Sequence, residues 1–165
     1  MQAGRRGQGL RPRDRRGQKG SPQDGPLHLL ALGAAAEAIQ DSGIDCEAEA
    51  ENIGVIVSSG IGGLPTIEEQ HSRGEEKGME KVSPYFVPMA IANMAAAQIA
   101  IRSASRGCVP AGDGCAGGTN AVGDAFHRIR DGYEPVMVCG GAESCISPLG
   151  IGGFTSMRPS PLLRT

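Results

Sequence analysis

Two short apolar runs, each followed at once by a glycine-rich turn, constrain the fold of this chain more than any other feature. The first run, Asn52 to Ser58, reads N-I-G-V-I-V-S and leads into the turn Ser59 to Gly63. The second, Pro135 to Cys139, reads P-V-M-V-C and leads into Gly140-Gly141. Continuous apolar runs of this length are typical of strands buried on both faces of a parallel sheet. Because helical patterns separate the runs, the sequence predicts an α/β fold with a mostly parallel sheet and flanking helices.

Two helices are expected around the first run. One face of the earlier helix is marked by apolar residues at helical spacing: Leu29, Leu32, Ala36 and Ile39. Gly43 follows them and is the expected C-cap of that helix. After the glycine turn, Thr66 and Glu69 have the spacing of a capping box, which predicts a helix over about Ile67 to Arg73.

Two more helices are expected further along the chain. The Ala- and Met-rich stretch from Met89 to Ile101 predicts a buried helix, preceded by a loop from Ser83 to Pro88. A weak strand is expected over Arg106 to Gly114, because glycines interrupt it. The next helix should cover Gly117 to Arg130. Its expected buried face holds four apolar residues: Val122, Ala125, Phe126 and Ile129.

The N-terminal segment differs in composition from the rest of the chain. Seven of the sixteen basic residues fall within the first twenty positions, among Gly, Gln and Pro. A segment so poor in apolar residues is expected to be a disordered tail over residues 1–27. A basic arm for nucleic acid and a transit peptide are the alternatives, but the segment lacks aromatic interleaving and an amphipathic period. The folded domain is expected over residues 28–158, followed by a short tail over 159–165.

Charge and cysteine content narrow the function classes. From His28 onward the chain has nine basic and sixteen acidic residues, a net charge of −7, so neither nucleic acid nor a membrane surface is expected as a partner. None of the five cysteines forms a C-x-x-C pair and the three histidines are scattered, so no metal or cofactor is expected. The odd cysteine count indicates a reducing compartment, the cytoplasm. No apolar run approaches the ~20 residues that span a bilayer.

Cys115 is the candidate nucleophile. It lies between an expected strand and the helix that begins near Gly117, and the positive end of a helix dipole favours a thiolate. Gly114, Gly117 and Gly118 leave room around it for a bulky acyl group. Strand, tight turn, nucleophile and helix form the arrangement called a nucleophile elbow. The alternative is a small buried core cysteine, which is expected of the other four.

Three other features are candidate sites. The Gly60 to Gly63 turn could hold a phosphate, but it lacks the spacing of a nucleotide-binding loop and is expected to serve packing. His127 lies twelve residues after Cys115, about 18 Å along the same helix, and cannot be its base there. Glu143 could be catalytic, although a buried carboxylate that ties loops together is the favoured interpretation.

Several blocks resemble the β-ketoacyl-acyl carrier protein synthases, the elongating condensing enzymes of type II fatty acid synthesis. The blocks follow the order of that family over about four-fifths of the chain. They are G-V-I-V-S-S-G-I-G-G-L from Gly54, S-P-Y-F-V-P-M from Ser83, N-M-A-A-A-Q-I-A-I-R from Asn93, G-T-N-A-V-G-D-A-F from Gly118 and G-G-A-E-S-C-I-S-P-L-G-I-G-G-F from Gly140. The resemblance implies a thiolase-like half-domain that is incomplete.

The resemblance also implies a reaction and its residues. Cys115 would attack an acyl thioester on acyl carrier protein, and malonyl-carrier protein would then lose carbon dioxide and attack the acyl-cysteine. Ile61 resembles a residue at the acyl-chain pocket, and the backbone N–H of Cys115 would be one arm of the oxyanion hole. The family implies a homodimer. Ala- and Met-rich helix faces such as Met89 to Ile101 would be exposed apolar surface.

The chain departs from the family in three places. It starts without the first glycine-rich strand, and it ends at Thr165, before the half that carries two active-site histidines and a lysine. Gly112-Asp113-Gly114 replaces a small β-branched run before the cysteine. Shifts of reading frame would explain all three departures. The chain is therefore expected to be truncated and inactive alone.

Three alternatives to a synthase remain open from the sequence. The first is a thiolase-like acyltransferase that acts on coenzyme A thioesters. The second is a non-catalytic partner subunit of the chain-length-factor kind, although such subunits normally lack the cysteine. The third is a decayed fragment that associates with a full-length synthase.

Overall fold

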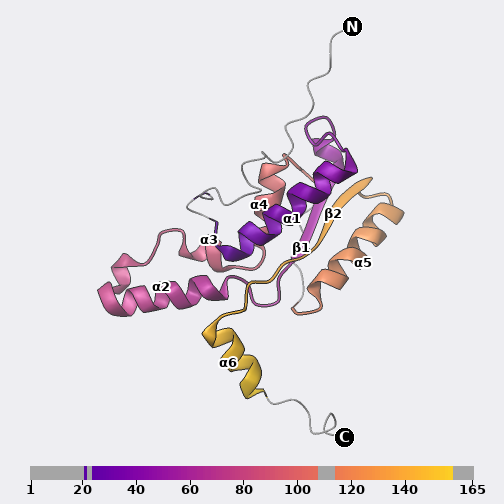
Figure 1. The fold of residues 1–165 in the computed structure, drawn as a ribbon. Helices are drawn as coiled ribbons and strands as arrows, with labels where there is room; N and C mark the ends of the chain where they lie inside the picture. Colours follow the sequence, from indigo (N-terminus) through magenta and orange to yellow (C-terminus); the bar gives the residue numbers. More distant parts are fainter. Residues whose placement is uncertain (1–20, 22–23, 108–113, 158–165) are drawn as a thin grey trace, which may run out of the picture.

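The structure is a computed structural model that describes residues 21, 24–107 and 114–157. Along the described chain, one helix precedes the first strand, four helices lie between the two strands, and one helix follows the second strand (Figure 1). Two short 3-10 helices lie among them. The elements are α1 (Pro26–Ser42), η2 (Ala50–Asn52), β1 (Ile53–Ser58), α2 (Leu64–Lys77), η3 (Met79–Lys81), α3 (Phe86–Ala90), α4 (Met94–Arg102), α5 (Gly117–Arg130), β2 (Val136–Gly141) and α6 (Pro148–Ser156).

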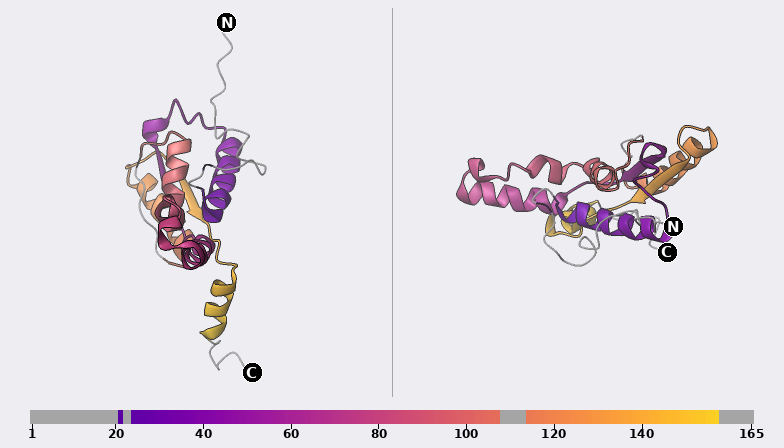
Figure 2. Two further views of the ribbon diagram at one scale, coloured as in Figure 1. Left: turned by 90° about the vertical axis from the view of Figure 1, so that its left-hand side faces the viewer. Right: turned by 90° about the horizontal axis from the view of Figure 1, so that it is seen from above.

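The two strands form a parallel pair between two layers of helices. Their register runs from Ile53 opposite Val136 to Ser58 opposite Gly141. Helices α1 and α4 cover one face of the pair and α5 covers the other (Figure 1). Helices α2 and α6 project away from these layers (Figure 2). The predicted α/β fold with a parallel sheet and flanking helices is confirmed.

Alternate residues of β1 divide the core in two. Val55 and Val57 pack with α1 and α4, whereas Ile56 packs with Ala121 and Ala125 of α5. All six residues of β1 are buried, as the continuous apolar run predicted. Full burial of one such aliphatic side chain stabilises the fold by about 1.5–3 kcal/mol.

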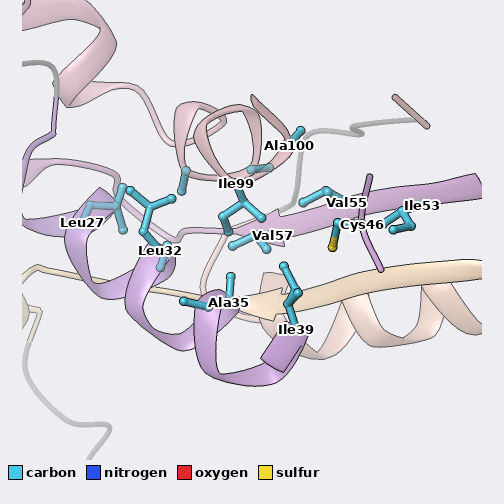
Figure 3. Packing of buried hydrophobic residues seen from close by; sticks show 14 residues of the cluster. Leu27, Leu32, Ala35, Ile39, Cys46, Ile53, Val55, Val57, Ile99 and Ala100 are labelled. Atoms are coloured by element: carbon cyan, nitrogen blue, oxygen red, sulfur yellow. The ribbon is translucent and has the colours of Figure 1, made fainter. Parts of the chain in front are cut away.

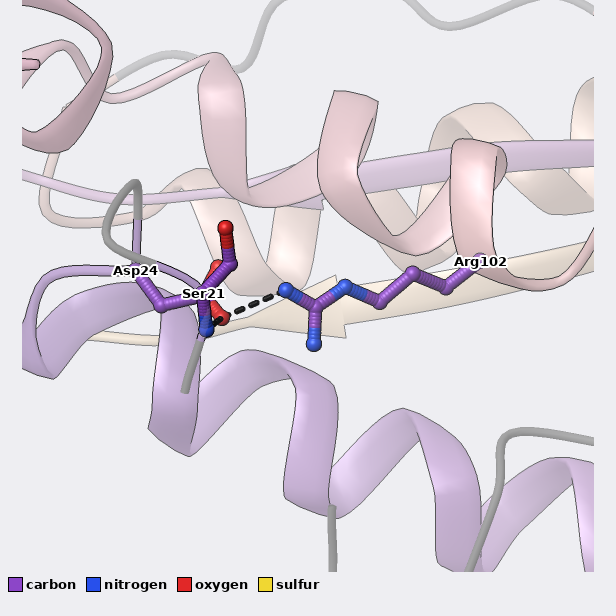
Figure 4. A network of polar contacts seen from close by, with 3 residues as sticks. All are labelled: Ser21, Asp24 and Arg102. Carbon is purple, nitrogen blue, oxygen red and sulfur yellow. Dashed lines mark hydrogen bonds and ion pairs between the residues drawn. The ribbon is translucent and has the colours of Figure 1, made fainter. Parts of the chain in front are cut away.

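The larger core lies between α1, α4 and β1 (Figure 3). Its members are mostly aliphatic or alanine side chains, among them Leu27, Leu32, Ile39, Val55, Val57 and Ile99. A partly buried ion pair lies beside α1 in the same layer (Figure 4). Arg102 of α4 donates to Asp24, whose side chain is fully buried and also accepts the backbone N–H of Ser21. The alanines that α1 and α4 contribute to this core allow the two helices to approach each other closely.

The first expected helix is present, with one correction to its face. Gly43 ends α1 in the left-handed conformation, with φ of 70°, as its C-cap role predicted. Leu32, Ala36 and Ile39 are buried, but Leu29 is 47% exposed. Leu29 was wrongly placed because the buried stripe begins at Leu27, two residues earlier.

The prediction of a capping box for the second helix is wrong. Helix α2 begins at Leu64, and its N-cap is Gly63, which carries no side chain to cap with. Thr66 therefore lies inside the first turn, where its side chain is buried. Pro65 in the first turn favours this earlier start, because proline tolerates only the unpaired N–H positions of a helix.

The single helix expected over Met89–Ile101 is also wrong. Helix α3 ends at Ala90, α4 begins at Met94, and Ile91 between them is extended, with ψ of 136°. The carbonyl of Ala90 accepts the N–H of Gly63 at 2.9 Å, so it is not free to continue a helix. Part of the expected loop from Ser83 to Pro88 belongs to α3. The expected apolar exposure is wrong for most of α4, whose Ala95, Ala96, Ile99 and Ala100 are buried, but Ile101 is exposed.

Helix α5 has the bounds that the sequence predicted, but a different buried face. Its buried residues are Gly117, Ala121 and Ala125. Three apolar residues of the expected face are 54%, 61% and 46% exposed: Val122, Phe126 and Ile129. Helix α5 packs against the sheet through glycine and alanine, and its larger apolar side chains lie outside that contact.

Some expectations fall on residues that are not described. They include residues 1–20 of the expected tail over 1–27, the tail over 159–165, and residues 108–113 of the expected strand from Arg106 to Gly114, which contain Cys108 and Asp113. Within the described ranges, no helix combines the length and the apolar character needed to cross a membrane.

Candidate active site

The glycine turn after β1 is held tightly against α3. Gly62 has φ of 92°, a conformation that residues with a side chain rarely adopt. A Cβ on Gly63 would lie 2.2 Å from the Met89 carbonyl oxygen. The turn is therefore a packed element, as the sequence predicted, and it presents Ile61 at the carboxyl end of β1.

The start of α5 lies against the carboxyl ends of both strands. A Cβ on Gly141, the last residue of β2, would lie 2.9 Å from the Cα of Gly118. Gly117 is equally crowded by β1, and only glycine fits at these contacts. Parallel α/β sheets place their ligand sites at the carboxyl ends of the strands, which is where these segments meet.

Cys115 lies in the turn that leads into α5. Residues 114–116 form the turn, Gly114 has φ of 49°, and Ala116 is the N-cap of the helix. The side chain of Cys115 is exposed, so it is not a buried core cysteine. A Cβ on Gly60 would lie 3.4 Å from the Cys115 Sγ. The thiol therefore faces the glycine turn across a narrow gap.

An open cavity of about 420 Å³ joins these segments. Its lining comes from the ends of β1 and β2, the glycine turn, the start of α5 and helix α6: Ser58, Ser59, Gly60, Ile61, Gly114, Cys115, Gly118, Gly141, Ala142, Glu143, Cys145 and Phe154. Cys115 and Ile61, the two site residues inferred from the sequence, thus line one cavity. Cys145 and Phe154 were not inferred, although both lie within the block from Gly140 that carried the family resemblance.

Glu143 connects the segment after β2 to the glycine turn. One carboxylate oxygen, Oε2, accepts the N–H of Ile61 at 2.9 Å and the Ser59 hydroxyl at 3.4 Å. The other, Oε1, accepts the N–H of Ser144 at 2.8 Å. Glu143 does tie two loops together, but its side chain is exposed rather than buried as expected. A carboxylate with these donors fixes the turn beside the cavity.

The histidines lie away from this cavity. His28 is fully buried in α1, and His71 and His127 lie exposed on α2 and α5. None of the three lines the cavity. Among the described residues, no three His, Cys, Asp or Glu side chains gather closely enough to hold a metal ion.

Two other thiols have altered acidity. Burial, assisted by the charge of Asp45, raises the pKa of the Cys46 thiol above its ordinary value. Partial desolvation also raises the pKa of the Cys139 thiol on β2, although that side chain is exposed, contrary to the buried position expected of it. A raised pKa lowers the thiolate fraction at neutral pH, so neither environment favours a nucleophile.

Comparison with known sequences agrees with this geometry. The family described as the N-terminal domain of beta-ketoacyl synthase matches residues 14–161. A 3-oxoacyl-[acyl-carrier-protein] synthase 2 from Synechocystis sp. is 42% identical over 133 residues, 78% of this chain and 32% of the relative. The enzyme of the same name from Staphylococcus aureus is 42% identical over 132 residues, with the same coverage of this chain. The chain spans about a third of the length of these curated relatives.

Solved structures agree on the fold. A β-ketoacyl synthase from Burkholderia phymatum STM815 superposes with a TM-score of 0.68 at 22% identity, over 82% of this chain and 34% of that one. A type II polyketide ketosynthase, solved with its acyl-carrier protein and bound to a hexaketide, gives a TM-score of 0.72 at 25% identity. That match covers 79% of this chain and 34% of the other.

Proposed function

The chain belongs to the β-ketoacyl synthase family, and from that premise we propose that Cys115 is the thiol that takes up an acyl chain for condensation with a malonyl unit. The observation that carries the proposal is the position of Cys115. Its exposed side chain lines an open cavity at the carboxyl ends of two parallel strands, in the turn before α5. A nucleophile needs this access, because the acyl carbon must come within bonding distance of sulfur.

The proposed step is acyl transfer to sulfur. The Cys115 thiolate attacks the carbonyl carbon of an acyl thioester, and a bond from Sγ to that carbon forms. The bond from the carbon to the donor's sulfur breaks, and the released thiol takes up the proton that Cys115 gave up. The backbone N–H of Cys115 would stabilise the oxyanion. The relative that was solved with its acyl-carrier protein supports a carrier protein as the donor.

The cavity suits an acyl chain better than a charged ligand. Ile61, Ala142 and Phe154 give it apolar walls, and Glu143 is the one carboxylate among the described residues that line it. Ile61 is proposed to contact the acyl chain, since it lines the same cavity as the thiol. The proposed function is the acyl-transfer step of fatty acid elongation, in a reducing compartment such as the cytoplasm, which keeps the thiol reduced. The chain alone is not expected to complete the condensation, because none of its histidines lines the cavity. A homodimer is part of the proposal, and the exposed apolar side chains of α5 support it.

Acylation of the protein tests the proposal. The protein is incubated with a long-chain acyl-carrier protein, and intact mass and peptide mapping locate the acyl group. One acyl group on Cys115 is expected, with none on the Cys115→Ser variant and an unchanged yield on Cys145→Ser, which removes the other thiol of the cavity. Acylation that persists in Cys115→Ser would overturn the assignment. Equal or faster transfer from acyl-coenzyme A would favour a thiolase-like acyltransferase instead.

A further inference from the structure

The contacts of Glu143 suggest more than a loop tie. Its Oε2 accepts the N–H of Ile61, and Ile61 lines the same cavity as Cys115. A Cβ built on Gly60 would lie 3.1 Å from the same oxygen and 3.4 Å from the Cys115 Sγ. The carboxylate and the thiol therefore both border one glycine.

Ser59 extends this contact into the turn. Its hydroxyl donates to Glu143 Oε2 and accepts the N–H of Gly62 at 3.0 Å. Glu143 thus fixes Ile61 directly and Gly62 through Ser59, while Ser144 holds its second oxygen. The donors in these contacts are two backbone N–H groups and one hydroxyl, and none of them is a Lys or Arg side chain.

We propose that Glu143 is a positioning residue, which sets the place of Ile61 relative to Cys115 and so determines how well the thiol accepts a long acyl chain. The inference rests on the proposed function of Cys115. Glu143 does not take part in bond making. Its role is to hold the wall that a long chain meets and a short one does not, since preorganised walls lose less conformational freedom on binding.

Two alkylating probes of different length measure this role. Iodoacetamide and its N-dodecyl derivative both react by the same step: the Cys115 sulfur displaces iodide, and the thiol proton goes to solvent. The ratio of the two rates at Cys115 cancels any change in the intrinsic reactivity of the thiol. Mass-spectrometric mapping gives the rates at each cysteine separately.

The expected result is a loss of long-chain preference. In Glu143→Ala the ratio of long-probe to short-probe rate should fall about threefold to tenfold, as expected for the loss of one solvent-exposed hydrogen bond. Glu143→Gln keeps a carbonyl oxygen that can accept the Ile61 N–H, and it should restore most of the ratio. Glu76→Ala on α2, an exposed glutamate away from the cavity, should leave the ratio unchanged. An unchanged or increased ratio in Glu143→Ala, or a Gln variant no better than Ala, would overturn the proposal.

Hydrogen exchange keeps the test independent of Cys115. The Ile61 amide should exchange slowly in the wild-type protein and about threefold to tenfold faster in Glu143→Ala, with α5 amides unaffected. An unprotected Ile61 amide in the wild-type protein would overturn the inference, whatever the cysteine does. If neither probe labels Cys115, the proposed function fails, and the exchange measurement still decides whether Glu143 holds Ile61.

Discussion

Gly117, the first residue of α5, lies directly against Ser58, the last residue of β1: a Cβ built on Gly117 would be 1.8 Å from the Ser58 Oγ. This contact sets how closely α5, and with it the turn of Cys115, approaches the sheet. A Gly117→Ala substitution should therefore push the helix away and lower the free energy of unfolding by about 1–3 kcal/mol. Urea unfolding followed by circular dichroism measures the change.

Gly123 provides the matched control for that substitution. It lies in the same helix, and a Cβ there would meet nothing within 4 Å. Gly123→Ala should raise the free energy of unfolding, by up to about 1 kcal/mol, because alanine favours a helix more than glycine does. Equal effects of the two substitutions would show that helix propensity, and not the contact with Ser58, decides the outcome.

The ion pair between Arg102 and Asp24 should contribute more to stability than the exposed pair between Arg106 and Glu51. The Asp24 side chain is fully buried, whereas both members of the second pair are more than 70% exposed. Arg102→Ala leaves a buried carboxylate without its charged partner and should cost about 3 kcal/mol. Arg106→Ala should cost less than about 1 kcal/mol. Similar urea midpoints for the two variants would contradict this ranking.

Labelling of Cys46 should depend on folding and on pH. Burial raises the pKa of its thiol above the ordinary value of 9.0, so at pH 8 the thiol is protonated as well as inaccessible. Iodoacetamide should label Cys46 about tenfold or more slowly in the folded protein than in urea, while exposed Cys115 should differ little. Mass spectrometry of timed samples gives both rates.

The same shift makes a prediction about alkaline stability. Since the folded state raises the pKa of the Cys46 thiol, its contribution to folding is fully present below pH 9.0 and is lost as pH rises through the raised pKa. A Cys46→Val variant should therefore lose less unfolding free energy between pH 8 and pH 10 than the wild-type protein. Parallel pH profiles for the two proteins would refute the assignment of this loss to Cys46.

The exposed apolar stripe of α5 should promote association. Val122, Phe126 and Ile129 lie at helical spacing and are each about half exposed or more. Phe126→Glu should lower the average mass in light scattering at high protein concentration, because a charge in such a patch opposes its burial. Ile101→Glu, at an exposed position on α4, is the control and should have a smaller effect. A wild-type protein that stays monomeric at every concentration would rule out association through this stripe.

The sequence predicted those elements whose burial pattern is set by the chain itself. β1 is an unbroken apolar run, and α1 and α5 end at residues with clear helix-stop chemistry, so their positions were recovered. The errors arose from tertiary contacts. The N–H of Gly63 takes the Ala90 carbonyl and interrupts the helix expected from Met89, and no local pattern reports a bond between those two residues.

In the candidate site, too, local features were predicted and tertiary contacts were not. The turn of Cys115 follows from a pattern that carries its own local geometry, whereas Ile61 was assigned to the site through the family resemblance. Phe154 lines the cavity from α6, and the hydrogen bond from the Ile61 N–H to Glu143 joins residues 82 apart in the chain. Such contacts depend on how the elements pack, which a single sequence does not specify.

The pairing of β1 with β2 has a consequence for synthesis on the ribosome. Ile53 pairs with Val136, so the six residues of β1, four of them aliphatic, leave the exit tunnel long before their partner strand exists. At about 5–20 residues per second, the delay lasts several seconds. Until then, only α1 and α4 can shield one side of β1, and its other side stays open to chaperones or to a second nascent chain. Late translation of β2 and α5 is therefore the step that commits this domain to its own sheet.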